Sequence, residues 1–202
     1  GVIYPGDVQW MTAASGILHK EYHEENFSKT GGLFQMVQLW INLPAKFKMS
    51  PPKYQGIQQS QLQKFSLENG GGVIEVIAGN YNGVIGNAST FSPIEMYNAR
   101  LNAGAHANFS FPEAYNTAFI VIEGQVKIND TAIANADQLV HFTNNGENIT
   151  VSALEDSVVL MLSGEPIKEP IVQYGPFLMN TEDEIQQAIA DYNHGKFGYL
   201  EE

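Results

Sequence analysis

Two residues near the start of the sequence, His19 and Glu21, have the types and the spacing of metal ligands. In an extended strand, side chains two positions apart point to the same face, so this imidazole and this carboxylate would converge. Such ligands suit a divalent metal such as ferrous iron and leave coordination positions open for other molecules. Oxygenase-type sites normally take at least three protein groups, so this pair is half a site. The alternative is a pair of polar side chains on a strand that faces a solvated cavity.

The composition restricts the other kinds of chemistry. The 202 residues include 10 basic and 22 acidic ones, and this net charge of −12 argues against direct nucleic-acid binding. The absence of cysteine excludes thiolate metal sites and disulfides, and it fits a reducing compartment such as the cytoplasm. Because no apolar run approaches the roughly 18 residues of a membrane-spanning helix, a soluble protein without a membrane partner is expected.

The elements that must position the pair are predicted to be short strands, as in an all-β sandwich or barrel. Residues 4–7 (YPGD) predict a turn. Residues 34–43 alternate apolar and polar side chains around Gln38 and Asn42, which predicts a half-buried strand. Further strands are expected at residues 61–67, 73–78, 94–101, 117–122, 125–128, 138–142, 148–153 and 157–162.

The C-terminus gives the one clear helix signal. Thr181 and Glu184 form a capping box, and Ile185 begins an apolar face that ends before Gly195. We expect this helix to dock on a sheet and to do no chemistry. The small, polar residues 86–93 predict a linker between an N-terminal domain, residues 1–85, and a C-terminal domain, residues 94–202.

Several longer motifs resemble the pirin family of bicupins. The N-terminal motifs are residues 5–13 (PGDVQWMTA), Gly16-Ile17, His19-x-Glu21 and residues 38–44 (QLWINLP). The C-terminal motifs are residues 164–166 (GEP) and 169–181 (EPIVQYGPFLMNT). The resemblance implies two cupin, or jelly-roll, β-barrels followed by the C-terminal helix. It also implies a non-haem iron, Fe(II) or a similar divalent metal, that three histidines and one glutamate hold in the first barrel.

His19 and Glu21 match the last two of these four ligands. The first two lie upstream in the family, in a His-x-His stretch that would precede Gly1, so we expect the first cupin domain to be incomplete. The metal is then expected to bind weakly or to be absent in this chain. In the second domain, the cupin ligand positions fall on Ser110, Pro112 and Thr117, which predicts no metal there.

The resemblance also implies two alternative functions. Bacterial members are associated with quercetinase activity, the dioxygen-dependent opening of a flavonol ring, whereas an animal member is a transcriptional co-regulator. A cupin isomerase or storage protein is a weaker third alternative. We therefore expect either a quercetin 2,3-dioxygenase-like enzyme, impaired in this chain, or a binding scaffold without catalysis.

For the enzyme, Glu21 is the candidate general base that removes the 3-hydroxyl proton of a flavonol, and we expect it to be buried near the apolar side chains of Trp10 and Met11. Trp10, Met11, Gln38 and Trp40 are the candidates for contact with a small aromatic substrate, although Trp40 also fits a packing role. An incomplete barrel exposes a strand edge, and such edges recruit other strands. A homodimer is therefore the expected assembly.

Overall fold

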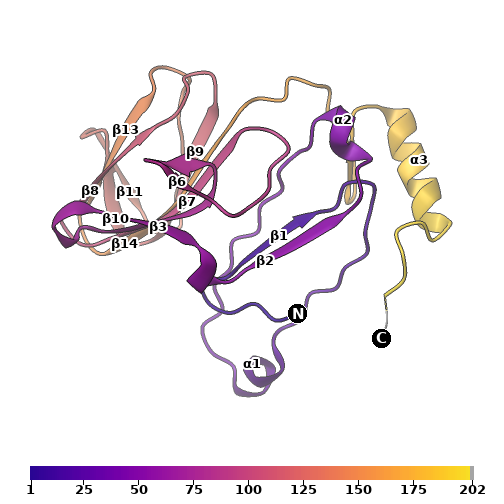
Figure 1. Cartoon of the computed structure of the whole chain (residues 1–202), viewed down its shortest axis with the longest axis horizontal. Coiled ribbons are helices and arrows are strands. Elements are labelled where there is room, and N and C mark those ends of the chain that lie inside the picture. Colours follow the sequence, from indigo (N-terminus) through magenta and orange to yellow (C-terminus); the bar gives the residue numbers. More distant parts are fainter. Residues whose placement is uncertain (201–202) are drawn as a thin grey trace. The chain divides into compact units, whose positions relative to one another are not determined.

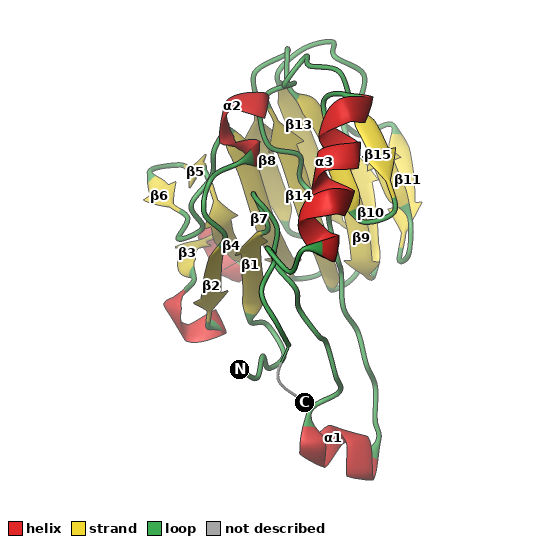
Figure 2. Cartoon of the chain, turned by 90° about the vertical axis from the view of Figure 1, so that its right-hand side faces the viewer, coloured by secondary structure: helices red, strands yellow, loops and turns green. Residues whose placement is uncertain are grey.

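The computed structural model describes residues 1–200, which divide into two compact units (Figure 1). Unit 1 comprises residues 1–4, residues 9–56 and the described residues from Ile167 onward. Unit 2 comprises residues 5–8 and 57–166. Strands and loops make up most of the chain, as predicted, and α3 is its longest helix (Figure 2).

Unit 2 contains two antiparallel sheets and a small hairpin. The six-stranded sheet has the order β12-β9-β14-β7-β4-β3, and the four-stranded sheet has the order β11-β10-β13-β8. The six-stranded sheet consists of β3 (Gln63–Ser66), β4 (Gly72–Ala78), β7 (Ile94–Leu101), β9 (Asn116–Glu123), β12 (Leu139–His141) and β14 (Ser157–Gly164). The other strands are β8 (His106–Ser110), β10 (Gln125–Ile128), β11 (Ala132–Asn135) and β13 (Asn148–Ala153), with the hairpin β5 (Asn80–Tyr81) and β6 (Val84–Ile85).

One hydrophobic core joins the two sheets. Alternate residues of each strand point into it, so β8 reads exposed, buried, exposed, buried, exposed. Phe109 from the four-stranded sheet meets Phe119 from the six-stranded sheet edge to face, with ring centroids 5.8 Å apart. This is the architecture of the predicted jelly roll.

The strand predictions are confirmed for most of unit 2. The runs at residues 94–101, 125–128 and 148–153 coincide with β7, β10 and β13 at both ends. Strand β4 precedes residues 86–93 and strand β7 follows them, and these two strands pair with each other in the six-stranded sheet. Unit 2 therefore does not begin at the predicted linker, and the two-domain division stays a prediction.

Unit 1 has less regular structure. Its elements are the paired strands β1 (Val8–Thr12) and β2 (Lys53–Ile57), the short helices α1 (Glu25–Thr30) and α2 (Ala45–Lys48), the hairpin of β15 (Val172–Tyr174) and β16 (Phe177–Met179), and α3 (Glu182–Asn193). The predicted capping box of α3 is confirmed. Thr181 Oγ1 accepts a hydrogen bond from the Glu184 backbone N–H, and the Glu184 carboxylate accepts one from the Thr181 N–H. Ile185 is the buried anchor of the helix.

The strand predicted at residues 34–43 is wrong, because this segment has no regular secondary structure. A strand persists only where a neighbour binds its backbone N–H and C=O groups, and within residues 1–200 no strand pairs with this one. The side chains that should be half-buried are accordingly exposed, with Val37 at 42% and Ile41 at 42%. Within the described residues, no helix has the length and apolar character needed to cross a membrane.

Candidate functional site

His19 and Glu21 lie side by side in the loop that follows β1. The Nδ1 atom of His19 is 3.9 Å from Oε1 of Glu21, and the two side chains are 45% and 46% exposed. The two side chains are thus close together as predicted, but the strand expected to carry them is wrong, because residues 16–24 have no regular secondary structure. The burial expected for Glu21 beside Trp10 and Met11 is wrong, because nearly half of its side chain is exposed to solvent.

The chain just before this pair is anchored by contacts within unit 1. The Ser15 N–H donates to the Ser50 carbonyl at 3.1 Å, and the Leu18 N–H donates to the Phe197 carbonyl at 3.2 Å. Gly16 has a φ of +118°, and a Cβ at this position would lie 2.3 Å from the Phe197 ring. Glycine is therefore required here both by the backbone conformation and by the packing of Phe197.

The pair alone does not make a closed metal centre. Within residues 1–200, no group of three or more histidine, cysteine, aspartate or glutamate side chains could hold a metal ion together. One imidazole and one carboxylate are two donors, fewer than a stable transition-metal site normally has. The described residues therefore fit part of a metal site and not the whole of it.

The four candidate substrate contacts have different surroundings. Trp10 and Met11 are half-buried neighbours in β1, where consecutive side chains point to opposite sides of the strand. Gln38 and Trp40 lie in the irregular segment, where Gln38 is exposed and Trp40 is 64% exposed. Because neighbouring strand residues diverge, a single pocket that uses both Trp10 and Met11 needs a bend in β1. Their role in substrate binding stays a prediction.

The ligand positions of the second cupin domain hold side chains with structural roles. Thr117 is buried and its hydroxyl lies 2.8 Å from that of Ser163, while Ser110 ends strand β8. The nearby His106 places Nδ1 2.8 Å from the Ser152 hydroxyl on the neighbouring strand β13. Thr117 with Ser163 and His106 with Ser152 thus form polar pairs across neighbouring strands.

One buried group in unit 1 is absent from the sequence predictions. Lys48 is 5% exposed, and its ammonium donates to Asn42 Oδ1 at 2.6 Å and to the Leu178 carbonyl at 3.1 Å. Burial lowers the pKa of Lys48, and the nearby carboxylates of Glu169 and Glu184 oppose this shift. In the sequence, Lys48 has the appearance of a surface charge, because only the folded chain brings β16 to it.

Comparison with known proteins gives the family. The model of the pirin C-terminal cupin domain matches residues 96–198, and the pirin model matches residues 1–41. A Pseudomonas aeruginosa protein named "Putative quercetin 2,3-dioxygenase" is 44% identical over 197 residues, covering 98% of this chain and 68% of that protein. Pirin-like protein 2 of Arabidopsis thaliana is 38% identical, with 98% of this chain and 62% of that protein covered.

A solved structure has the same fold over nearly the whole chain. The crystal structure of quercetin 2,3-dioxygenase from Acinetobacter baumannii is 44% identical in sequence, with a TM-score of 0.92. The match covers 98% of this chain and 69% of that one. The chain thus spans between three fifths and seven tenths of the length of these relatives. At this identity and coverage, with family models matching both ends, this mainly β chain with its C-terminal helix belongs to the pirin family of cupin proteins.

Proposed function

We propose that this chain carries two ligands of a metal-dependent centre of the quercetin 2,3-dioxygenase type, with Fe(II) or a similar divalent ion. The observation that carries the proposal is the 3.9 Å approach of His19 to Glu21. The names of the Pseudomonas and Acinetobacter relatives support the reaction class. A further set of ligands is needed to complete the centre.

Glu21 is the proposed general base. A flavonol becomes reactive toward dioxygen once its 3-hydroxyl has lost a proton, and a carboxylate within hydrogen-bond reach can accept that proton. The carboxylate is 46% exposed, which leaves it open to an incoming hydroxyl group. His19 lies beside it, with Nδ1 3.9 Å from Glu21 Oε1.

Metal binding by the purified chain is the first test. Because two donors bind a divalent ion weakly, we expect less than one iron per chain after purification without chelator. His19→Ala should lower the metal content further. His141→Ala, which removes an exposed histidine from β12, should leave it unchanged. One tightly held iron per chain, or equal metal content in the His19→Ala variant, would contradict the proposed half-site.

Activity is the second test. Oxygen uptake with quercetin and added ferrous iron should be slow for this chain and slower still for His19→Ala. It should be at least about 100-fold slower for Glu21→Gln, the range of one positioned acid–base group. Near-ultraviolet circular dichroism of each variant checks that its fold is intact. Equal rates for the chain and both variants would exclude a role for the pair in this reaction.

The half-exposed, two-donor pair also favours a second candidate, a binding or regulatory scaffold without catalysis. This alternative predicts no oxygen uptake at any concentration of added iron. It also predicts that ferrous iron leaves the melting temperature unchanged. An ion that binds the folded state would raise that temperature by mass action. A metal-dependent rise in melting temperature that is lost in His19→Ala would favour the first candidate.

A further inference from the structure

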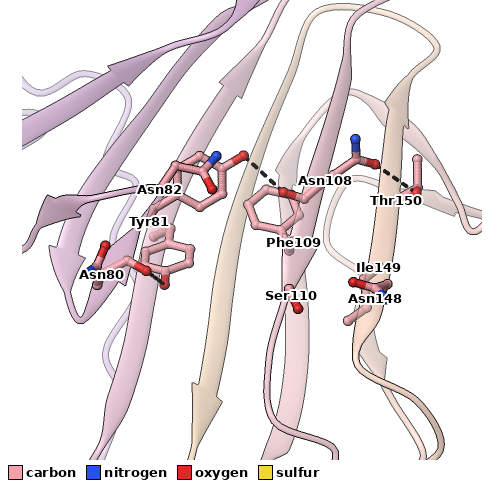
Figure 3. Close-up of a pocket in the computed structure, with 10 residues that line it drawn as sticks. Asn80, Tyr81, Asn82, Asn108, Phe109, Ser110, Asn148, Ile149 and Thr150 are labelled. Carbon is pink, nitrogen blue, oxygen red and sulfur yellow. Dashed lines mark hydrogen bonds between the residues drawn. The ribbon is translucent and has the colours of Figure 1, made fainter.

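Unit 2 has a pocket of about 350 Å³ between the β5–β6 hairpin and strand β8 (Figure 3). Small-molecule sites commonly have volumes of roughly 300–1,000 Å³, so this pocket could hold a compact ligand. Three short stretches line most of it: residues 80–82, residues 108–110 and residues 148–150. All of them belong to unit 2, whereas His19 and Glu21 belong to unit 1. The inference below therefore does not depend on the proposed function.

The lining is polar and uncharged. Asparagine side chains, together with Ser110 and Thr150, supply its hydrogen-bonding groups, and none of the described lining residues carries a charge. The nearby acid, Glu95, is occupied: its carboxylate accepts from the Asn80 N–H at 2.7 Å and from the Tyr97 hydroxyl. A cation would need carboxylates and an anion would need lysine or arginine, so the lining favours a neutral ligand.

Several of these polar groups have no partner in the folded chain. Within residues 1–200, the side chains of Asn82, Ser110 and Asn148 form no hydrogen bond. The Oδ1 atom of Asn108 accepts from the Thr150 hydroxyl at 2.9 Å, which leaves the Asn108 NH₂ group available (Figure 3). Amides and hydroxyls can both donate and accept, so these groups match a ligand that does the same.

The aromatic side of the pocket is fixed before any ligand arrives. The rings of Tyr81 and Tyr97 meet edge to face with centroids 5.4 Å apart. The Tyr81 hydroxyl donates to the Asn108 carbonyl at 3.0 Å (Figure 3). The Tyr97 hydroxyl donates to the Asn80 carbonyl at 3.0 Å. These bonds tie the hairpin to β8 and to β7. Little further ordering of the hairpin is therefore needed when a ligand binds.

We propose that this asparagine pocket binds a neutral polyhydroxylated molecule of the size of a monosaccharide. The hydroxyl groups of such a ligand satisfy the free amides of Asn82, Asn108 and Asn148. An apolar ligand would instead leave these amides unsatisfied and desolvated.

The test measures binding by ligand-observed NMR with four probes. Methyl β-D-glucoside and myo-inositol are the neutral probes, and glucose 6-phosphate and glucosamine are their charged counterparts. We expect at least one neutral probe to bind about tenfold more tightly than either charged probe, a difference of about 1.4 kcal/mol. The absence of binding by both neutral probes, or equal binding of the charged ones, would overturn the proposal.

Matched variants locate the binding. Asn82 has a φ of +49°, so Asn82→Gly removes the amide without straining the backbone, and Asn148→Ala removes a second exposed amide. Each should raise the dissociation constant about tenfold, the effect of one lost hydrogen bond. Asn26→Ala in α1 removes an exposed asparagine of unit 1 and should leave it unchanged. Equal weakening by Asn26→Ala, or no weakening by either pocket variant when melting temperatures match, would overturn the proposal.

Discussion

At the scale of single residues, Tyr97 connects the core of unit 2 with its polar pocket. Its side chain is 2% exposed, and its hydroxyl shares its one proton between the Asn80 carbonyl and the Glu95 carboxylate. Burial raises the pKa of Tyr97, and the hydrogen bond to Glu95 and the charge of Glu95 raise it further. Burial also raises the pKa of Tyr81. Both hydroxyls therefore remain protonated donors in the folded protein.

These shifts predict a loss of stability at alkaline pH. A tyrosine with a raised pKa in the folded state holds its proton there while the unfolded chain loses it above a pH of about 10. Its stabilising contribution is complete below that pH and disappears as the pH rises further. We expect urea unfolding to show a steep fall in the free energy of unfolding above pH 10, and a shallower fall in Tyr97→Phe.

At neutral pH the same variant should be less stable. Tyr97→Phe removes the donor of the hydrogen bonds to the Asn80 carbonyl and the Glu95 carboxylate, at a cost of about 1–3 kcal/mol. Tyr174→Phe is the control, because the Tyr174 side chain is 66% exposed and such changes stay within about 0.5 kcal/mol. If the free energy of unfolding falls equally steeply above pH 10 in Tyr97→Phe and in the unmodified chain, the role assigned to Tyr97 is contradicted.

At the scale of elements, α3 is defined by local signals. The capping box of Thr181 and Glu184 and the acidic first turn are visible in the sequence and present in the structure. The hairpin β15–β16 packs next to α3, and this hairpin was not predicted because its strands have only three residues each. Short strands carry too few residues to show a period, so their pairing depends on tertiary contacts.

The cap predicts a measurable loss of helix stability. Thr181→Ala removes the oxygen that accepts the Glu184 N–H and should lower the free energy of unfolding by about 1 kcal/mol. Thr181→Asn should retain most of that stability, because asparagine is also a good N-cap residue. Chemical denaturation followed by circular dichroism checks both values. Equal losses in the alanine and asparagine variants would show that the cap hydrogen bond is not the cause.

At the scale of the whole molecule, the exposed apolar segment at residues 33–41 favours association. Leu33 is 91% exposed and Trp40 is 64% exposed, and contiguous apolar surface of this kind commonly marks an interface. The homodimer stays a proposal. It rests on this surface and on unpaired backbone groups that another strand could bind.

Light scattering tests this association. We expect the average mass to rise with protein concentration in the micromolar range, and the double variant Val37→Lys with Trp40→Lys to remain monomeric, because two new charges oppose burial of the segment. Tyr174→Lys places one charge at another exposed aromatic residue and serves as the control. A constant monomer mass for the unmodified chain would contradict the proposed dimer.

The sequence by itself determined the family, most strands of unit 2, the helix α3 and the convergence of His19 with Glu21. The strands and the helix follow from local spacing, through strand periodicity and a capping box, and the family follows from the longer motifs near both ends of the sequence. His19 and Glu21 lie close together because only one residue separates them, although no strand spans them. The tertiary structure decided which segments find partners. Residues 34–43 have a strand pattern without a strand beside them, Lys48 is buried by β16, and the asparagine pocket joins residues from 80 to 150. Hydrogen-bond partners and burial arise from residues distant in the chain, and no local pattern contains them.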